Sequence, residues 1–386
     1  MVNKNVGRKH PEPLVLGLSA PNIPVDPALL TRPGAFAWWY VDLVDEHGDG
    51  LVLIWSWGLP FLPGLAGAAR RGAPVAPGDR PSMNVAVYQG GTPRFYLLQE
   101  IDPQDARWDP ETDRWEFGQS RITLDRTPDG RHHLRVTLDC PVPGMPDRLQ
   151  GTVEVIGHER IHEGDGHGDP RHAWTPLMTA CPGSAKLRCG DWSADITGRA
   201  YHDRNSGVQP MHTLGIDRWW WGRIALPGRE LIYYHLVPED PGEDTQTLVV
   251  EVDSNGRTRL AESARVEILD TRRSIYSLSW TTRLRFWDPD GQEVRVRMTA
   301  GVDDSPFYQR LLIEGTCGGE SGRGVAELVV PDAIDPDWMR WLVGMRVHHA
   351  GGDNSVWLPL FSGPREGRPG RVLGQLLGRP VAPAQP

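Results

Sequence analysis

The residues best suited to chemistry lie in one short segment, Ala200 to Gly207, which reads AYHDRNSG. Tyr201, His202 and Asp203 place a phenol, an imidazole and a carboxyl group in consecutive positions, and all three groups can transfer protons. Alternate side chains of a strand share a face, so Tyr201 and Asp203 are expected on one side and His202 on the other. The second half of the segment is also typical of a turn after a strand, because turns select Asp, Asn and Gly.

An aromatic triplet, Trp219 to Trp221, follows this segment closely. A carboxyl group beside tryptophan and tyrosine rings is desolvated, which raises its pKa and keeps it protonated near neutral pH. We therefore predict that Asp203 is a general acid. His172 and Trp174 form a second alternating pair and are expected to share a face. A loop histidine beside a core tryptophan is the simpler interpretation of that pair.

Missing motifs exclude several classes of enzyme. The chain has no nucleophile elbow, Walker loop, dinucleotide-binding glycine pattern or zinc signature. Arg204 stands where an elbow would need a glycine before Ser206, so neither a serine hydrolase nor a nucleotide-dependent enzyme is expected. The four cysteines form no CxxC pair, and we expect them to be reduced, with a bridge between Cys181 and Cys189 as the alternative.

Three histidines, His158, His162 and His167, lie in a loop rich in Gly, Asp and Glu. The first two have the i,i+4 spacing of a metal-binding pair on a helix, but the neighbouring glycines disfavour a helix. Because ligating histidines need a rigid scaffold, we expect a solvated loop here rather than a metal site. No metal and no cofactor are expected in the rest of the chain.

Composition limits the partners of the protein. The chain of 386 residues has a formal net charge of -9, which argues against nucleic acid, since that partner requires a basic face. No run approaches the ~20 apolar residues of a spanning helix, and no secretory signal pattern is present, so a cytoplasmic protein is expected. There are 16 Trp residues but only 7 Phe, which is about three times the usual tryptophan content. The excess indicates core packing, a π-rich cavity, or both.

The elements that must position these residues are predicted to be strands. Short apolar runs alternate with Gly, Pro, Asp and Asn turns, which indicates an all-β fold of antiparallel barrels or sandwiches. A hairpin near Trp38 resembles a second one near Trp220, which favours a tandem of two related β domains. The predicted strands span residues 38–44, 51–57, 83–88, 94–100, 114–117, 120–125, 132–138, 149–155, 185–187, 192–201, 218–226, 230–236, 245–252, 264–269, 279–287, 293–300 and 308–315.

The expected domain organisation has four parts: an irregular lead-in over residues 1–34, β domains over 35–190 and 191–362, and a flexible tail over 363–386. Residues 65–71 are predicted to form a short helix or flap, which either covers a cavity mouth or crosses the surface.

The strongest helix pattern spans residues 335–346. Asp335 is suited to cap it and Pro336 to its first turn. Apolar residues surround most of this helix, so it is expected to lie between the domains or to dip into a membrane surface. Arginines in the tail favour a disordered segment with weak affinity for anionic headgroups.

Five segments together resemble the carotenoid 1,2-hydratases, also called hydroxyneurosporene synthases. The order and spacing of these segments match from about residue 33 to about residue 348, and the Tyr-x-Asp-x-Asn-x-Gly pattern is the most specific part. The matching segments are residues 37–42 (AWWYVD), 84–88 (NVAVY), 201–207 (YHDRNSG), 219–223 (WWWGR) and 305–308 (SPFY).

This resemblance implies a fold, a reaction and a set of functional residues. Members of the family resemble a tandem of two lipocalin-like barrels, in a superfamily that also includes fungal pericyclases. The implied reaction adds water across the terminal 1,2 double bond of an acyclic carotenoid, such as neurosporene or lycopene, without a cofactor. By resemblance, the functional residues are His172, Trp174, Tyr201 and Asp203.

Hydration of an isolated alkene needs a proton delivered to C2, a tertiary cation at C1 beside aromatic faces, and one positioned water. We assign Asp203 as the acid and Tyr201 as the partner that orients it. His172 is expected to position or deprotonate the water, and Trp174 and Trp220 to stabilise the cation. The residues expected to contact the substrate are Trp39, Asn205, Trp219, Trp220 and Trp221.

One departure from the family pattern leaves the substrate open. Val208 and Gln209 follow Gly207, where many hydratases carry an acidic pair. The alternatives are a cofactor-free cyclase, pericyclase or isomerase acting on another polyene or terpenoid, and a lipocalin-like carrier without chemistry. Because carotenes reside in bilayers, a peripheral contact with the inner face of the cytoplasmic membrane is expected.

Overall fold

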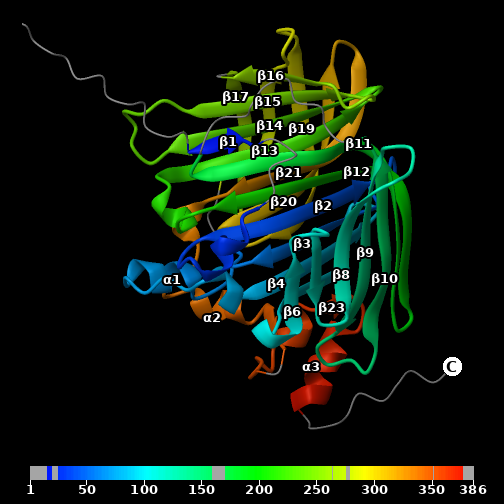
Figure 1. Cartoon of the computed structure of the whole chain (residues 1–386), viewed down its shortest axis with the longest axis vertical. Coiled ribbons are helices and arrows are strands. Elements are labelled where there is room, and N and C mark those ends of the chain that lie inside the picture. The colour runs from blue at the N-terminus through cyan, green and yellow to red at the C-terminus, as the bar shows by residue number, and fades with distance from the viewer. Residues whose placement is uncertain are drawn as a thin grey trace, which may run out of the picture.

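The computed structural model describes residues 15–19, 25–158, 170–262, 264–274, 279–350 and 352–376. Most of these residues belong to two β-sheets, each curled into a half-barrel, and helices are few and short (Figure 1). The predicted all-β tandem of lipocalin-like units is therefore confirmed. Of the loop predicted around the three histidines, His162 and His167 lie outside the described residues.

Within the described part of the chain, the first sheet has 14 strands. Neighbouring strands are antiparallel except for two additions: β1 (Leu16–Leu18) runs parallel to β11, and β22 (Val347–His349) runs parallel to β5. The remaining strands are β2 (Phe36–Val44), β3 (Gly50–Trp57), β4 (Pro81–Gln89), β5 (Thr92–Glu100), β6 (Ala106–Asp109), β7 (Arg114–Phe117), β8 (Ser120–Arg126), β9 (His132–Pro141), β10 (Arg148–Gly157), β11 (His172–Cys189), β12 (Trp192–Gly207) and β23 (Gly363–Pro364).

The second sheet has nine strands and is antiparallel throughout. Its strands are β13 (Ile216–Leu226), β14 (Arg229–Pro238), β15 (Gln246–Asp253), β16 (Thr258–Glu262), β17 (Val266–Arg273), β18 (Ser279–Trp287), β19 (Glu293–Asp304), β20 (Tyr308–Cys317) and β21 (Glu320–Val329). Every strand predicted from the apolar runs lies in one of the two sheets, but β11 begins 13 residues before the predicted range 185–187, and β12 continues six residues past the predicted end at residue 201. Six strands were not predicted: β1, β6, β16, β21, β22 and β23.

Alternation along the strands divides the apolar side chains among three clusters. One cluster, which includes Trp39 and Trp115, fills the inside of the first sheet. Another, which includes Trp220 and Phe286, fills the inside of the second sheet. A third, here called the central cluster, draws residues from both sheets and includes Tyr201. The two half-barrels therefore pack against each other through the central cluster, which is separate from the apolar interior of each sheet.

A fully buried ion cluster also joins the two sheets. Arg223 of β13 donates from Nε to both carboxylate oxygens of Asp42 in β2, at 2.8 and 2.9 Å, and pairs with Glu230 of β14 as well. All three side chains are 0% exposed. Since a buried charge without its partner is costly, this cluster fixes how the sheets meet.

The predicted domain limit at residues 190 and 191 falls in the tight turn between β11 and β12, which are neighbours in the first sheet. The chain passes to the second sheet after Gly207, and β22 and β23 return to the first sheet. The domain limits themselves stay a prediction, whereas the sheets divide between residues 207 and 216.

Helices are short. The helix predicted at residues 65–71 is confirmed as α1 (Leu65–Arg70), and the other α-helices are α2 (Arg340–Gly344) and α3 (Arg368–Leu376). The 3-10 helices are η1 (Pro27–Thr31), η2 (Pro77–Asp79), η3 (Pro103–Asp105), η4 (Met211–Thr213), η5 (Pro331–Ala333) and η6 (Leu358–Leu360).

The described parts of both chain ends contain more regular structure than expected, and the helix expected near the C-terminus is shorter. The lead-in contains β1 and η1, and the tail contains α3, whose Arg371 is buried against the backbone carbonyl groups of Ser362 and Pro364. The helix expected at residues 335–346 is reduced to α2. Asp335 does not cap it, because its backbone has a φ of 55° and its carboxylate accepts a hydrogen bond from the Gly67 N–H at 2.8 Å.

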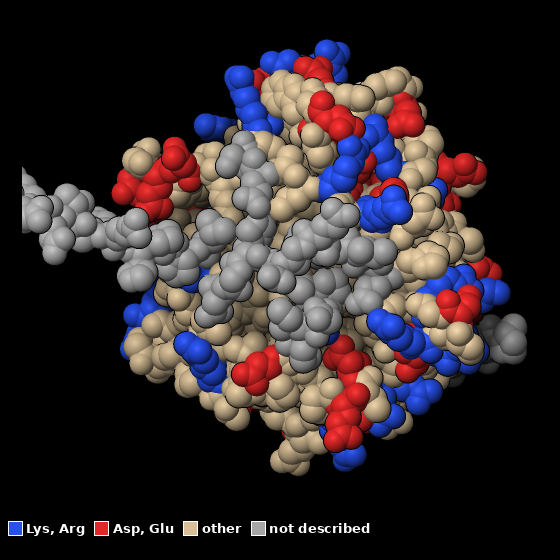
Figure 2. Space-filling model, turned by 45° about the horizontal axis from the view of Figure 1, so that its top comes forward, with Lys and Arg blue, Asp and Glu red and all other residues tan. Residues whose placement is uncertain are grey.

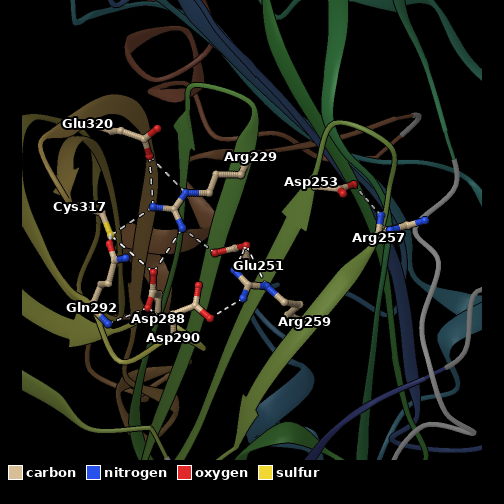
Figure 3. Close-up of polar contacts among 10 residues, drawn as sticks. All are labelled: Arg229, Glu251, Asp253, Arg257, Arg259, Asp288, Asp290, Gln292, Cys317 and Glu320. Atoms are coloured by element: carbon tan, nitrogen blue, oxygen red, sulfur yellow. Dashed lines mark hydrogen bonds and ion pairs between the residues drawn. The ribbon is translucent and has the colours of Figure 1, made fainter.

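Ion pairs secure one end of the second sheet. The Arg229 guanidinium lies among Glu251 at 2.7 Å, Asp288 at 3.3 Å, Glu320 at 3.2 Å and the Cys317 thiol at 3.4 Å (Figure 3). On the face drawn in Figure 2, basic and acidic side chains are interspersed rather than separated by sign.

Within the described ranges, no helix has the length and apolarity to cross a membrane. All four cysteines are buried and free.

Candidate active site

Asp203 lies between the two sheets and is the centre of a group of hydrogen-bonded side chains. Its Oδ2 atom accepts from the Tyr201 hydroxyl at 2.8 Å and from the Trp174 indole N–H at 2.9 Å. Its Oδ1 atom accepts from the Asn205 amide at 2.8 Å. The expected turn from Asp203 onward is instead the end of β12, so Tyr201, Asp203 and Asn205 alternate onto one face. The cluster assembles the residues that the sequence singled out.

The neighbouring strands fix this geometry. In antiparallel pairs, residues directly opposite each other share a face. Asp203 lies opposite Tyr40 of β2, and Asn205 lies opposite Trp174 of β11. The register of β11 against β12 shifts between Pro176 and Cys181, and such irregularities re-aim side chains beside functional sites.

His172 reaches Asp203 through Asn205. The His172 Nε2 atom lies 3.0 Å from Asn205 Oδ1. Because the Asn205 amide nitrogen donates to Asp203, its oxygen must accept from His172, which requires a proton on Nε2. Burial lowers the pKa of His172 to about 4, so the ring is neutral near pH 7. His172 is therefore a donor that orients the amide.

The surroundings of Asp203 raise the pKa of its carboxyl group, so the protonated form persists to a higher pH than usual. Its pKa is raised to about 7, chiefly by burial and also by the nearby carboxyl groups of Glu327 and Asp42, while the hydrogen bonds from Tyr201 and Trp174 act in the opposite direction. Near neutral pH the carboxyl group is thus present in both forms. Burial also raises the pKa of Tyr201 well above its usual value, so its hydroxyl remains a donor.

A small cavity of about 30 Å³ lies beside Asp203. This volume holds about two water molecules. The cavity draws its walls from both sheets, with Asp203 on the first and Glu327 on the second, and most of the remaining walls are aromatic. The lining residues are Trp38, Tyr40, Ile54, Leu59, Phe61, Asp203, Asn205, Trp219, Trp221, Tyr234 and Glu327.

A larger cavity of about 220 Å³ adjoins the first. Ile54, Leu59 and Phe61 line both cavities, so these three side chains form the wall between them. Leu59 and Phe61 begin the segment that leads into α1, which was expected either to cover a cavity mouth or to cross the surface. This part of the segment lies against the cavities.

Two residues expected to contact the substrate lie elsewhere. Trp39 packs inside the first sheet against Trp115, with ring centroids 5.0 Å apart. Trp220 packs inside the second sheet and donates from its indole to Thr281 at 2.8 Å. Each is one position out of phase with the cavity-facing residues of its strand. His202, as predicted, also faces away, toward Trp39.

Trp219, Trp221 and Asn205, which were expected to contact the substrate, line the cavity. Trp174 belongs to the cluster through its indole N–H rather than through the cavity wall. Sequence reasoning missed Tyr40, Tyr234 and Glu327. A signal for Glu327 was present, because it is a lone acidic residue in an otherwise apolar run, VAELVV. Among the described residues, no group of three or more His, Cys, Asp or Glu side chains could hold a metal ion.

Known structures share the fold. An AttH-like protein from Nitrosomonas europaea matches with a TM-score of 0.55 at 16% identity, covering 80% of this chain and 98% of that one. CghA in complex with Sch210972 matches with a TM-score of 0.55 at 12% identity, covering 81% of this chain and 94% of that one. At these identities the likeness concerns the fold alone.

Sequence relatives are more specific. A protein of Chlorobaculum tepidum named hydroxyneurosporene dehydrogenase is 26% identical over 356 residues, covering 85% of this chain and 91% of that protein. The acyclic carotenoid 1,2-hydratase of Thiocapsa roseopersicina is 27% identical over 331 residues, covering 84% of this chain and 75% of that enzyme. The family model of the carotenoid hydratase CrtC matches residues 58–354, well over half of the chain. The chain belongs to the carotenoid hydratase CrtC family, and with it to the hydro-lyases.

Proposed function

We propose that this protein adds water across the terminal 1,2 double bond of an acyclic carotenoid of the neurosporene or lycopene type, by acid catalysis and without a cofactor. The observation that carries the proposal is the buried Asp203 carboxyl group, whose pKa of about 7 keeps it partly protonated beside an aromatic cavity. The family and the names of its relatives support the substrate class.

The reaction begins with proton transfer from Asp203 to C2 of the alkene, which leaves a tertiary cation at C1. Such a cation is stabilised by the faces of aromatic rings. Tyr40 and Trp221 are in T-shaped contact across the two sheets, with ring centroids 5.2 Å apart, and Tyr234 and Trp219 complete the aromatic wall. Water then forms the C1–O bond, and a proton is lost to give the tertiary alcohol.

The other members of the cluster hold the acid in place. Tyr201 and Trp174 both donate to Oδ2, and both are essentially fully buried. Asn205 holds Oδ1, and His172 holds Asn205. In this role His172 positions the cluster rather than taking a proton from water. A group fixed by three donors delivers its proton with little reorganisation.

The larger cavity is suited to the polyene chain behind the reacting end. Apolar and aromatic residues of the first sheet, of the turn before β20 and of α2 make up most of its lining. The remaining lining is polar or charged: Asn84, Asp303, Asp304, Ser305, Arg310 and Arg346. Both cavities together are far smaller than a carotenoid, so most of the substrate remains beyond them. Phe61, in the wall between the cavities, would have to move for the terminal alkene to reach Asp203.

We also propose that the surface around the larger cavity contacts a lipid bilayer. Among the described residues, seven large apolar side chains are exposed, and six of them lie in or beside α2, η6 and α3. Trp338 is 72% and Trp341 65% exposed. Leu342 of α2 and Phe361 beside η6 line the larger cavity, so the exposed tryptophans next to them in the chain belong to the same segments. Residues 338–376 carry five arginines and two carboxylates, in a chain of net charge -9. Exposed tryptophans beside arginines suit an anionic membrane surface.

Sedimentation with phosphatidylglycerol vesicles tests this contact. Replacing both Trp338 and Trp341 with serine should lower the bound fraction about tenfold or more, since each buried tryptophan contributes to the affinity. Leu269→Ser is the matched control, because Leu269 is 48% exposed on the second sheet, away from this region. Equal binding of the double variant and the control would refute the proposed contact.

The experiment that tests the function is incubation of the purified protein with detergent-dispersed neurosporene or lycopene, followed by mass spectrometry. Hydration predicts a product heavier by one water. A converted product of unchanged mass would instead indicate cyclisation or isomerisation, and binding without conversion would indicate a carrier.

A further inference from the structure

The small cavity beside Asp203 is lined by a second acidic side chain, that of Glu327. Glu327 lies on β21 of the second sheet, directly opposite Trp221 of β13 and Arg310 of β20. In the same cavity Asp203 comes from the first sheet, so the two acidic side chains face one small space from opposite walls. Glu327 and Asp203 are the two carboxylates among the lining residues.

Glu327 is held firmly through one oxygen. The Tyr308 hydroxyl donates to Glu327 Oε1 at 2.6 Å, and Arg310 Nε donates to the same atom at 3.0 Å. Arg310 is 1% exposed and also donates to the Tyr88 hydroxyl at 3.1 Å. Within the described part of the chain, no hydrogen bond reaches Oε2. Tyr308 and Arg310 thus occupy Oε1, whereas Oε2 keeps its lone pairs for a further donor such as water.

The cavity also contains a polar atom suited to holding water. Tyr40 is only 4% exposed, and its buried hydroxyl has no hydrogen-bond partner among the described residues. Buried hydroxyl groups without a protein partner are usually satisfied by water. The volume of about 30 Å³ is sufficient for that water.

The two carboxyl groups have complementary surroundings. Asp203 accepts hydrogen bonds only from neutral donors, and burial favours its protonated form. Glu327 has a guanidinium partner. Sites that separate two carboxyl groups in this way usually assign one as acid and the other as base. His172, in contrast, is absent from the cavity wall and is committed to Asn205.

We propose that Glu327 is the general base of the hydration, accepting the proton of the water that attacks C1. The inference rests on the proposed function. Asp203 gives its proton to C2 as the alkene π bond breaks, and a water lone pair forms the C1–O bond. The oxonium proton passes to Glu327 Oε2. The proton on Glu327 then returns to Asp203 through solvent, so the net change is one alkene plus one water to one tertiary alcohol.

The test is Glu327→Gln, assayed in D₂O at pH 6 with lycopene. Glutamine can still accept from Tyr308 and Arg310, so the variant should fold and bind the polyene, which quenching of tryptophan fluorescence verifies. Hydrated product should fall about 100-fold or more, the usual contribution of a general base. Because the variant slows the attack of water while its acid is intact, the cation is expected to return a proton to Asp203, and recovered lycopene should contain deuterium at C2.

Two further variants complete the design. Glu327→Asp keeps the base and should recover part of the lost rate. Glu314→Gln is the matched control, since Glu314 of the neighbouring strand β20 forms exposed ion pairs with Arg297 and Arg323 and should hydrate lycopene like the wild type.

Three outcomes would overturn the inference. If Glu327→Gln forms product within about threefold of the wild-type rate, Glu327 is not the base. If the folded variant binds lycopene but exchanges no deuterium, Glu327 supports the acid step instead. If the wild-type protein itself forms no hydrated product while converting or merely binding lycopene, the proposed function fails, and the role of Glu327 fails with it.

Discussion

The hydrogen bond from Tyr201 to Asp203 makes a quantitative prediction about pH dependence. Asp203 must be protonated to act, so the rate should fall as the pH rises through its pKa of about 7. The Tyr201 hydroxyl, 2.8 Å from Oδ2, stabilises the charged carboxylate. Removing it in Tyr201→Phe therefore favours the protonated form, and the alkaline limb of the profile should move to higher pH.

The size of this change follows from the bond that is lost. A hydrogen bond to a charged group contributes about 1.5–3 kcal/mol, and about 1.4 kcal/mol corresponds to one pH unit. The limb should therefore move upward by about 1–2 pH units. The Trp174 indole still donates to Oδ2 in the variant, so the smaller value is the better expectation.

The assay is the dependence of kcat/KM on pH, which reports the pKa of the free enzyme. The position of the limb is independent of any general loss of rate, so it separates the electrostatic effect from poorer orientation. Tyr233→Phe is the control, because Tyr233 is fully buried inside the second sheet, away from Asp203. A limb that stays in place or moves to lower pH would refute this reasoning.

Two further predictions concern the walls of the site and the joint between the sheets. Trp221→Phe should lower kcat about tenfold by weakening contact with the cation, whereas Trp220→Phe, on the opposite face, should leave kcat within about twofold; equal losses would contradict the assignment of faces. Asp42→Asn weakens the buried partner of Arg223 and should lower the free energy of unfolding by about 3 kcal/mol in urea titrations; a change below about 1 kcal/mol would show that Glu230 alone compensates the charge.

Many of the strands and the shared face of Tyr201 and Asp203 could be predicted because short-range rules determine them. Alternation along residues 192–207 placed Tyr201 with Asp203, and the structure agrees. Which side chains of the neighbouring strand face Asp203 could not be predicted in the same way. Trp38, Trp39 and Tyr40 are all apolar and all buried, so no polar face marks which of them meets Asp203.

Contacts between distant segments were beyond the sequence for a related reason. Glu327 lies 124 positions after Asp203 in the chain, and only the packing of the second sheet against the first brings both to one cavity. Asp335 illustrates the same limit. It has the residue type of a helix cap, but its carboxylate accepts a hydrogen bond from the Gly67 N–H of α1 instead. The helix expected after it is short.

The central claim is that Asp203 delivers the proton, and Asp203→Asn tests it most directly. Asparagine keeps the shape of the side chain and can still accept from Tyr201 and Trp174, so circular dichroism and thermal unfolding should resemble those of the wild type. In D₂O with lycopene, the variant should form no hydrated product and introduce no deuterium at C2. Product formation within about tenfold of the wild-type rate by a folded variant would contradict the account, since a lost general acid costs about 100-fold or more.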